Sequence, residues 1–419
     1  MLDTAALDAA VDDAADDAFA LLERLVAQPS TVGQESGALD VFAESMLALG
    51  FDVEDLDLPL ATPEDPRGGV AQAIDGPRRQ VVARGGGGSG RSLLLHGHID
   101  VVPAESADLW TTPPFDPRRS GDRMYGRGAG DMKAGFAMGA LAMGALMRVD
   151  PGAIRGPLGF LAAIEEECTG NGTLAAAHAG VVADAVVLLE PTGLDIMVGG
   201  VGVLWCDIDL LGTSGHAESS HLAANPIDLA QHMIAGLRSW AARLDAETHD
   251  PAFDDLTHPY NVNFGQLTAG DWPSSVPTRA RLRARFGYPR AWSAEKAEHE
   301  VRAAVARIAD EAGMPHAPSV RLSGFRARGY LVDPGHELVV AMSDAHEQVH
   351  GARPTPFVMG STTDARFYVN DFNVPALCYG PTAYDIHGID ESVDLPSIVA
   401  GAKALARFMA SWFAEERSS

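Results

Sequence analysis

The chain has 419 residues, with 31 basic and 57 acidic side chains and a formal net charge of −26 at pH 7. Such an acidic surface repels phosphate backbones and anionic lipid headgroups, which argues against a nucleic-acid partner and against docking on membranes. Hydrophobic residues make up 46% and charged residues 21%, which excludes a disordered chain. At about 150 residues per domain, this length predicts two or three domains.

Cysteine use and the N-terminus indicate a reducing compartment. The three cysteines, Cys168, Cys206 and Cys378, are too few and too scattered for a disulfide framework. The first residues lack the basic and apolar stretches of a signal peptide, and no apolar run reaches the roughly 18 residues that a membrane span needs. We therefore expect a soluble, cytoplasmic protein.

The N-terminal part predicts two helices followed by a strand. Apolar residues recur at helical spacing over 7–28, where we expect one helix that Pro29 ends. A second helix is expected over 38–49 and a strand from residue 50. The glycine run at 85–88 is typical of a hairpin tip, and because no Gly-Lys-Ser or Gly-Lys-Thr follows it, it is not a phosphate loop.

The next stretch predicts buried strands that alternate with helices. Apolar runs at 92–95, 158–164 and 185–189 are typical of strands buried on both faces. The segment 133–147 is apolar nearly all round, which indicates a helix packed inside the protein. A further strand is expected at 376–379. This alternation predicts an α/β fold with a mostly parallel sheet.

The pattern changes around residue 200 and predicts an inserted α+β domain. Its order of strand, helix, strand, strand, helix and strand is that of a ferredoxin-like unit. The sequence thus predicts a discontinuous catalytic domain, 1–197 and 319–419, with a lid or dimerisation domain inserted at 198–318. The first five inserted elements are expected at 203–211, 225–247, 262–267, 279–286 and 293–313.

Side chains that bind metals well follow the buried strands. In an open α/β sheet the carboxyl ends of the strands meet at one crevice, so we expect these side chains to converge. Imidazole and carboxylate ligands without thiolate suit Zn²⁺, Mn²⁺ or Co²⁺, and their number fits two ions that share one bridging carboxylate. The residues are His96, His98 and Asp100 after the first strand, Glu165, Glu166 and Glu167 after the second, Glu190 after the third, Asp131 before the buried helix, and His387 after the last strand.

Each of these residues has an ordinary structural explanation when taken alone. His98 would be a core histidine, Asp131 a helix cap and 165–167 an exposed acidic face. However, 165–167 directly follows an apolar strand, and no Lys or Arg lies near it in the sequence. At least one carboxylate is therefore forced inward, where it needs a metal or a cationic partner. Together, these residues favour a metal centre.

Four motifs carry a resemblance to a known family. They are His-Gly-His-Ile-Asp-Val-Val-Pro at 96–103, Gly-Arg-Gly-Ala-Gly-Asp-Met-Lys-Ala-Gly at 126–135, Glu-Glu-Glu at 165–167 followed by two glycines, and Glu-Pro-Thr at 190–192. In this order they resemble the family of acetylornithine deacetylase, succinyl-diaminopimelate desuccinylase, aminoacylase and glutamate carboxypeptidase. The resemblance covers nearly the whole chain and implies a zinc aminopeptidase-like catalytic domain, an inserted lid and two Zn²⁺ ions, with Co²⁺ or Mn²⁺ as substitutes.

The resemblance also implies a role for each residue of the centre. Asp131 would bridge the two metal ions, with a cis peptide bond directly after it, and Asp100 would orient His98. Glu166 would be the general base. The implied ligands are His98, Glu190 and Asp131 for one ion, and His387, Glu167 and Asp131 for the other.

The Glu-Glu-Glu motif allows two registers, because the family usually has Asp-Glu-Glu here. Counting from Gly170 and Gly172 puts Glu165 on the family's aspartate, which makes Glu166 the base and Glu167 the ligand. A slip by one residue would instead make Glu165 the base and Glu166 the ligand.

The inserted domain carries a motif that implies a dimer. Gly-Thr-Ser-Gly-His-Ala-Glu at 212–218 resembles the family's lid motif. His216 matches the histidine that reaches into the partner's active site in dimeric members, where it stabilises the oxyanion. Taken alone, His216 would be a surface histidine in a polar turn. The resemblance therefore implies a homodimer formed through the lid domain.

The substrate contacts depart from the family pattern. Relatives place an Asp and then an Arg near the end of a lid strand, and this Arg grips the substrate carboxylate. The matching positions here are Arg285 and Gly287, so Arg285 would have to substitute with shifted geometry. We name Asn263, Arg285 and Arg366 as candidate substrate contacts, and for Arg366 a structural role is equally open.

The sequence therefore predicts a binuclear zinc amidohydrolase that acts on a small N-acylated molecule, with an N-acyl amino acid as the nearest class. A dipeptidase or carboxypeptidase uses the same metals and base, but the missing lid arginine weakens the grip on a free carboxylate that it needs. A deformylase or deacylase of a non-amino-acid amine would explain that absence. A non-enzymatic binding or scaffold protein is disfavoured, because no expected ligand or base is missing.

Overall fold

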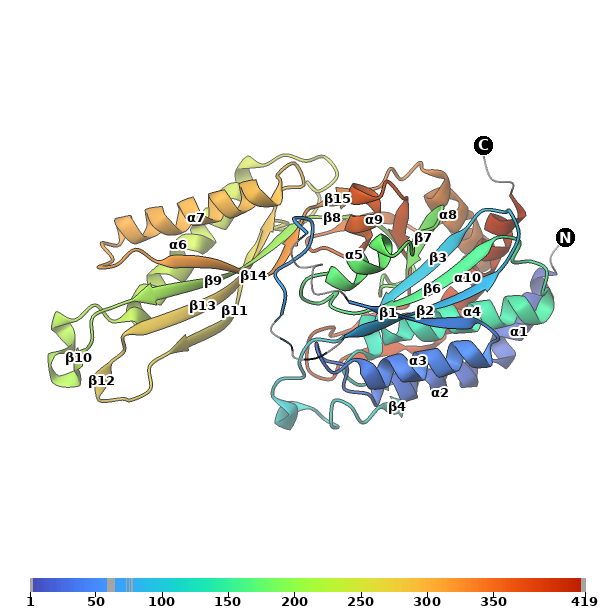
Figure 1. Ribbon diagram of the computed structural model, residues 1–419, viewed down its shortest axis with the longest axis horizontal. Helices are drawn as coiled ribbons and strands as arrows, with labels where there is room; N and C mark the ends of the chain where they lie inside the picture. Colours follow the sequence, from blue (N-terminus) through green and yellow to red (C-terminus); the bar gives the residue numbers. More distant parts are fainter. Residues whose placement is uncertain (1–2, 59–64, 73, 75, 77, 416–419) are drawn as a thin grey trace.

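The computed structural model describes residues 3–58, 65–72, 74, 76 and 78–415. The chain forms two units that lie side by side (Figure 1). The larger unit holds a nine-stranded sheet together with the first and last helices, and the smaller unit holds a four-stranded sheet with two long helices. This is the mixed α/β architecture that the sequence predicts.

The nine-stranded sheet has a parallel centre. Its four central strands, residues 157–163, 93–98, 185–188 and 376–378, run parallel, so their carboxyl ends lie at one edge. The outer strands add mostly antiparallel pairs. In spatial order the strands are β1 (Asp52–Asp57), β2 (Arg79–Gly86), β6 (Pro157–Ala163), β3 (Leu93–His98), β7 (Ala185–Leu188), β17 (Ala376–Cys378), β8 (Ile196–Gly200) and β15 (Tyr330–Leu331), with β16 (Pro356–Met359) also paired to β8.

Helices cover both faces of this sheet. In β3, Leu93 and Leu95 point into the core beneath one set of helices, and Leu94 points into the core beneath the other. Strands that are apolar on both faces are thus buried on both faces. One face carries α1 (Thr4–Asp13), α2 (Ala15–Val26), α3 (Ser36–Ala48), α4 (Ala134–Val149), α8 (Glu337–His350) and α10 (Leu395–Ala414), and the other carries α5 (Asn171–His178) and α9 (Ala365–Asp371).

The single helix expected over 7–28 is wrong. Ala14, with φ −101° and ψ 6°, breaks this segment into α1 and α2. Both short helices pack against α4, and their apolar residues, such as Val11 and Leu22, are fully buried in the same core. Because of the break, both helices can turn their apolar faces toward the same core. In one straight helix these faces would point in different directions.

The segment Ala129–Val149, which includes α4, is long and apolar enough to cross a membrane by length and composition alone. The sequence predicted a shorter apolar helix, over 133–147. However, 78% of its most apolar window is buried inside the protein. Packing against the central sheet and α10 accounts for its composition, as predicted for a helix inside the protein.

The four-stranded sheet, here called the lid sheet, has the predicted ferredoxin-like order. In space its strands are β11 (Val262–Ala269), β13 (Arg279–Tyr288), β9 (Gly202–Leu211) and β14 (Ser319–Ala327), and all neighbours are antiparallel. Helices α6 (Pro226–Glu247) and α7 (Ala294–Glu311) cover one face and bury alternate strand residues such as Leu282 and Phe286. The short strands β10 (Gly215–His216) and β12 (Ser275–Val276) pair at the end far from the large sheet (Figure 1).

The second boundary of the inserted domain lies later than 318. Strand β14 follows that position and pairs along most of its length with β9, so it belongs to the lid sheet. We therefore place this boundary after Ala327. The predicted boundary at 318 cut off this last strand of the predicted ferredoxin-like unit.

Two short connections join the units. Val201 alone separates β8 from β9, and 328–329 separate β14 from β15. Gly200 and Tyr330, which flank these connections, are antiparallel partners in the large sheet. The chain thus enters and leaves the lid sheet through two adjacent strands.

A small sheet supports the loops beside the carboxyl edge of the large sheet. Its spatial order is β18 (Ala383–Tyr384), β19 (Ser392–Asp394), β5 (Arg123–Tyr125) and β4 (Arg118–Ser120). The pairing of β19 with β5 brings the loop 385–391 next to the segment 126–131. These two segments carry His387 and Asp131.

Candidate metal centre

Most of the side chains expected at the strand ends line one cavity of about 550 Å³, but His96, Asp100 and Glu165 do not. The large sheet, the loops beside it and the lid sheet all contribute to its wall. His96 is buried in the core, with Nε2 3.0 Å from Thr173 Oγ1. The polar and charged residues that line the cavity are His98, Asp131, Glu166, Glu167, Glu190, Asn261, Asn263, Arg285, Ser361, Thr362, Thr363 and His387.

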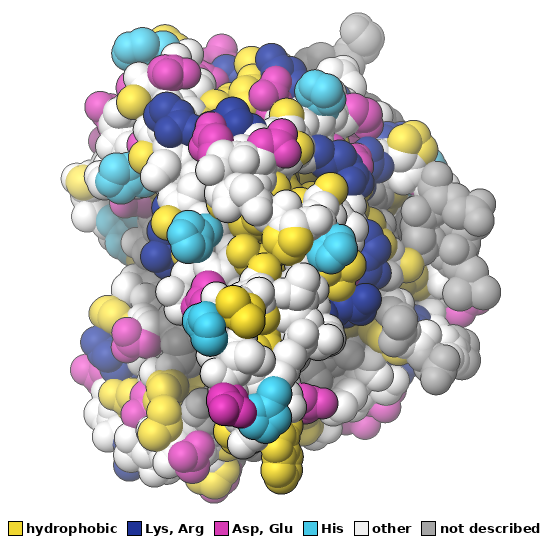
Figure 2. Space-filling model, turned by 90° about the vertical axis from the view of Figure 1, so that its left-hand side faces the viewer, with side chains coloured by type: hydrophobic (Ala, Val, Ile, Leu, Met, Phe, Trp, Pro, Cys, Tyr) yellow, Lys and Arg dark blue, Asp and Glu magenta, His cyan; other side chains and the backbone are white. Residues whose placement is uncertain are grey.

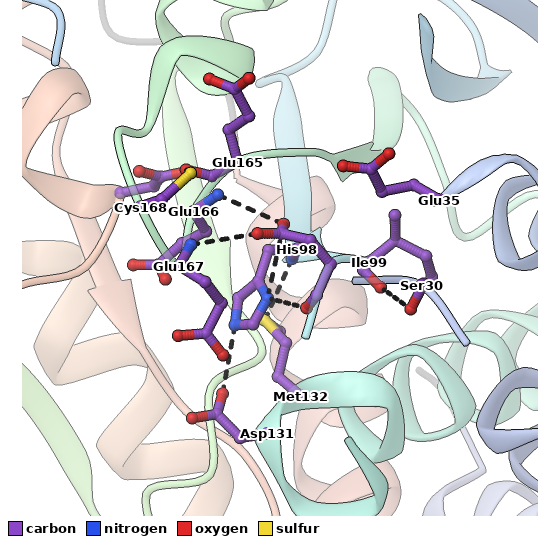
Figure 3. A network of polar contacts seen from close by, with 12 residues as sticks. Ser30, Glu35, His98, Ile99, Asp131, Met132, Glu165, Glu166, Glu167 and Cys168 are labelled. Atoms are coloured by element: carbon purple, nitrogen blue, oxygen red, sulfur yellow. Dashed lines mark hydrogen bonds and ion pairs between the residues drawn. The ribbon is translucent and has the colours of Figure 1, made fainter. Parts of the chain in front are cut away.

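Asp131 lies between two histidines. Its Oδ1 is 3.1 Å from His98 Nε2 (Figure 3), and its Oδ2 is 3.3 Å from His387 Nε2. Glu190 Oε2 lies 3.8 Å from His98 Nε2, and Glu167 Oε2 lies 3.2 Å from His387 Nε2. Each side therefore has one imidazole and one carboxylate of its own, and the two sides share Asp131. The peptide bond from Asp131 to Met132 is cis, as expected.

The donor atoms of this cluster fit divalent metal ions. Glu167 Oε1 and Glu190 Oε1 are buried without a hydrogen-bond partner. Buried acceptors that lack a donor are rare in folded proteins, because desolvation then goes uncompensated. Ligand atoms of His98, Asp131 and Glu167 all lie within 4.8 Å of one another. Imidazole nitrogen and carboxylate oxygen in this number are the donors that Zn²⁺, Co²⁺ and Mn²⁺ accept.

Burial of so many carboxylates shifts their protonation. Burial raises the pKa of Glu190 to about 8 and raises the pKa of Glu166 well above its usual range. Burial lowers the pKa of His387, but the neighbouring Glu167 and Asp131 outweigh burial and raise it to about 11. Each shift favours a bound proton, and divalent cations coordinated by the same side chains would take the place of these protons.

Glu165 points away from the cluster, as Figure 3 shows. Its carboxylate pairs with Arg78, which also pairs with Glu35. Glu166 and Glu167 line the cavity instead. This arrangement favours the register in which Glu166 is the base and Glu167 the ligand. This cationic partner was not predicted, because Arg78 is 87 residues away from Glu165 along the chain.

Asp100 makes different contacts from those expected. Its carboxylate accepts the backbone N–H groups of Glu166 at 3.2 Å and of Glu167 at 3.1 Å. The same carboxylate is 3.8 Å from His98 Nδ1, whereas the backbone carbonyl of Asp100 is only 2.9 Å from that atom. Asp100 thus orients His98 mainly through its backbone, and its side chain fixes the turn that carries Glu166 and Glu167.

A buried ion pair holds the backbone of Asp131. Glu391 accepts the N–H of Asp131 and that of the residue before it, both at 2.9 Å, and pairs with Arg127 at 2.5 Å. Arg127 also donates to the carbonyl of Gly388 at 3.0 Å. Neither partner was predicted from the sequence: Arg127 lies inside the motif at 126–135 without a predicted role, and Glu391 is 260 residues from Asp131 and belongs to no motif.

Two of the three candidate substrate contacts line the cavity, namely Asn263 and Arg285. Arg285 donates to Asn261 Oδ1 at 2.7 Å and to the carbonyl of Gly360 at 2.8 Å. Burial lowers its pKa to about 10, so it stays charged at neutral pH. Among the described residues no carboxylate forms an ion pair with Arg285.

Arg366 lies outside this cavity and is buried. It donates to the carbonyls of Thr363 and Thr169, both at 3.0 Å, and lies 3.2 Å from Asp364. These contacts tie α9 to the loop after β6. They favour the structural role that the sequence left open over a contact with substrate.

His216 is exposed on β10, at the far end of the lid sheet from the metal cluster (Figure 1). It does not line the cavity of its own chain. Figure 2 views the molecule from this end, where histidine, hydrophobic and charged side chains are interspersed. Leu222 and Trp272, which lie near β10 and β12 in sequence, are 79% and 68% exposed.

Comparisons with known proteins agree with this site. A family model described as peptidase family M20/M25/M40 matches residues 94–411. The chain is 29% identical over 393 residues to a succinyl-diaminopimelate desuccinylase of Leptothrix cholodnii, a match that covers 91% of this chain and 94% of that protein.

Solved structures show the same fold at low sequence identity. The dipeptidase Dug1p of Saccharomyces cerevisiae aligns with a TM-score of 0.80 at 16% identity, over 99% of each chain. Human carnosine dipeptidase 1 aligns with a TM-score of 0.77 at 16% identity, over 98% of this chain and 100% of that one. The family model spans well over half of the sequence and includes every residue of the metal cluster. The chain therefore belongs to peptidase family M20/M25/M40 and is a metal-dependent hydrolase.

Proposed function

We propose that the protein hydrolyses the amide bond of a small N-acylated amino acid at a centre of two divalent cations. The observation that carries this proposal is the geometry of Asp131, whose two oxygens face different histidines. A carboxylate placed in this way suits two metal ions that it bridges. The relative from Leptothrix cholodnii is named for removing a succinyl group, which supports N-acyl hydrolysis as the reaction class.

The proposed ligands divide into two sets around Asp131. His98, Glu190 and one oxygen of Asp131 would hold one ion, and His387, Glu167 and the other oxygen would hold the second. Zn²⁺ is our first choice from this donor set, with Co²⁺ or Mn²⁺ as substitutes. When bound, such ions polarise a carbonyl group and lower the pKa of a coordinated water molecule to near neutrality.

Glu166 is the proposed general base. It lines the cavity next to the ligand Glu167, and neither ligand set needs it. Asp100 fixes its backbone through the 3.2 Å hydrogen bond to its N–H. In this position Glu166 would take a proton from the attacking water and pass it to the nitrogen of the leaving amine.

Arg285 supports a substrate with one free carboxylate. Among the described residues that line the cavity, it is the only Lys or Arg. The charges of Asp131, Glu166, Glu167 and Glu190 would cancel those of two divalent cations, which leaves the charge of Arg285 uncompensated. A substrate carboxylate would neutralise this remaining positive charge. This argues against an amine that lacks a carboxylate, the alternative kept open by the missing family arginine.

The apolar side chains of the cavity wall suit the acyl group of such a substrate. Trp205, Phe325 and Met359 line the cavity. A dipeptide is the second candidate, because it too has an amide bond and a free carboxylate for Arg285. It would, however, bring a free ammonium group where an N-acetyl or N-formyl amino acid brings a neutral chain, and burial of an unpaired charge against apolar side chains is costly.

We also propose a homodimer formed through the lid domain. From the end of the lid sheet, His216 cannot reach the cavity of its own chain. To take part in catalysis, it would have to enter the cavity of a second copy. There it would stabilise the oxyanion that forms as the amide carbonyl is attacked. The exposed Leu222 and Trp272 would lie near such an interface. A cytoplasmic location remains a prediction from the sequence.

The test is a substrate screen on zinc-loaded protein, with and without chelator. It compares N-acetyl, N-formyl and N-succinyl amino acids with dipeptides and with N-acyl amines that lack a carboxylate. We expect chelator-sensitive cleavage of the N-acyl amino acids. Preferential cleavage of dipeptides would support the second candidate, and cleavage of amines without a carboxylate would contradict the role of Arg285. Binding of fewer than two metal ions would contradict the proposed centre itself.

A further inference from the structure

The two histidines of the cluster are anchored in different ways. His98 ends the buried strand β3, and its Nδ1 lies 2.9 Å from the carbonyl of Asp100. His387 lies in the loop 385–391 between two short strands, and half of its side chain is exposed. The sheet therefore fixes His98, whereas contacts from outside the loop must fix His387.

The loop that carries His387 has an unfavourable backbone. Asp385, His387 and Asp390 have φ values of 53°, 62° and 56°, in the left-handed region that residues other than glycine rarely adopt. Such a conformation persists only where the surrounding structure enforces it. The contacts that hold this loop therefore decide where the imidazole of His387 points.

Arg127 makes the buried contacts that tie this loop to the segment of Asp131. Its guanidinium reaches Glu391 Oε2 at 2.5 Å and the carbonyl of Gly388 at 3.0 Å, and it stacks over Trp110 at 5.2 Å from the ring centroid. The side chains of Arg127 and Glu391 are only 3% and 1% exposed. Through its other oxygen, Glu391 accepts the N–H of Asp131. One buried ion pair thus connects both loops.

We propose that Arg127 is a positioning residue for the His387 side of the metal centre. By binding both Gly388 and Glu391, it keeps His387 in its position facing Asp131. The His98 side does not depend on Arg127, because β3 and Asp100 anchor it. This inference rests on the proposed two-metal centre and names the residue that makes its two sides unequal.

The conservative variant Arg127→Lys separates positioning from charge. Lysine keeps the positive charge beside Glu391, but its compact ammonium group cannot reproduce the planar fork that serves two acceptors in different directions. The matched control is Arg119→Lys, a change on β4 of the same small sheet. Arg119 is partly exposed and 3.7 Å from its ion-pair partner Asp16.

The experiment measures zinc dissociation constants of the full-length apoprotein by competition with a chromophoric chelator. In the wild type we expect two sites, and in R127K we expect one of them to weaken by about 10- to 100-fold, the usual effect of losing a partner that supports a ligand. R119K is expected to bind zinc like the wild type. Circular dichroism checks that each variant is folded.

Two backgrounds show which site has weakened. His387→Ala leaves only the His98 side, and adding R127K there should change its zinc affinity less than about twofold. His98→Ala leaves only the His387 side, and adding R127K there should produce the full loss. Equal losses in both backgrounds would mean that R127K merely loosens the protein, which overturns the proposal. The absence of a loss in the His98→Ala background also overturns it.

Glu391→Gln provides a second, nearly isosteric variant if R127K does not fold. Because Glu391 also holds the backbone of the shared Asp131, we expect E391Q to weaken both sites, and wild-type affinity at both would overturn the proposal. Failure of the metal centre itself is distinguishable. A wild type that binds fewer than two zinc ions contradicts the proposed function, whereas two ions bound by R127K with wild-type affinity contradict only the role of Arg127.

Discussion

Arg285 of the lid sheet donates a 2.8 Å hydrogen bond to the carbonyl of Gly360 in the larger unit. A charged side chain of one unit is thereby fixed against the other unit, at the wall of the cavity that His98, Asp131 and His387 line. Its partners are neutral oxygens, so its charge remains available to a ligand.

Replacing Arg285 should therefore raise KM for substrates with a free carboxylate. We expect Arg285→Gln to lower kcat/KM for an N-acyl amino acid by roughly 10²-fold, because a hydrogen bond to a charged group is worth about 1.5–3 kcal/mol. The matching primary amide substrate should lose little. Arg281→Gln is the control, since Arg281 lies on the same face of β13 but pairs with Asp209. An equal loss for both substrates would argue against carboxylate binding.

The three consecutive glutamates should give three different phenotypes. Glu166→Gln should lower kcat by about 10²- to 10⁴-fold, the usual contribution of a general base, while the metal content is retained. Glu167→Gln should lose metal. Glu165→Gln should mainly lower the thermal midpoint, because it breaks the buried pair with Arg78. Metal analysis, steady-state kinetics and thermal unfolding of the three variants decide the register, and substantial turnover in metal-loaded E166Q would contradict it.

Metal removal should abolish activity and lower stability. Two ions that bind only the folded protein stabilise it by mass action, by about 2.7 kcal/mol for each ion at 100 times its dissociation constant. We expect the thermal midpoint to fall on chelation and to rise again with Zn²⁺, Co²⁺ or Mn²⁺. Calorimetry of the apo and reloaded protein measures this. Chelation that leaves both activity and midpoint unchanged would exclude a functional metal centre.

Asp100→Asn should impair catalysis more than metal binding. The carboxylate accepts two backbone N–H groups, from Glu166 and Glu167, and an asparagine can accept only with its one oxygen. Its amide group would face the other N–H, so the turn that carries the base should shift. The backbone contact of Asp100 to His98 remains in this variant. We expect kcat to fall while the His98 side still binds zinc, and a loss confined to zinc binding would contradict this assignment.

Mixed dimers test whether His216 acts in the partner subunit. His216→Ala and Glu166→Gln should each be nearly inactive alone. If His216 acts in trans, a mixed dimer has one site with an intact Glu166 that receives an intact His216, so mixing after dissociation should restore activity, up to about a quarter of the wild-type level for random pairing. No recovery on mixing, with dimers shown to exchange, would contradict a role in trans.

The sequence predicts well which side chains lie together around Asp131, because their positions follow local rules. His98, Glu167 and Glu190 come directly after apolar strands, and parallel strands bring their carboxyl ends to one edge. The structure does bring them together around Asp131. The order of elements in the lid sheet was equally readable from alternating hydrophobicity, and it is confirmed.

The partners of these residues were not predictable, because they come from distant segments. Arg78 meets Glu165 across 87 residues, and Glu391 meets Asp131 across 260. Neither contact leaves a local pattern, since one buried arginine or glutamate resembles any other in the sequence. The break at Ala14 was missed for a related reason: the direction in which a helix must turn depends on the core it covers.

The two adjacent connections between the units bear on how such a chain can be built. Gly200 and Tyr330 are paired neighbours in one ladder, and antiparallel strands can be joined by a turn of two residues. A chain in which such a turn replaces 201–329 would keep every strand of the large sheet. The lid sheet is thus inserted at what would otherwise be a simple hairpin, and the large sheet is topologically complete without it.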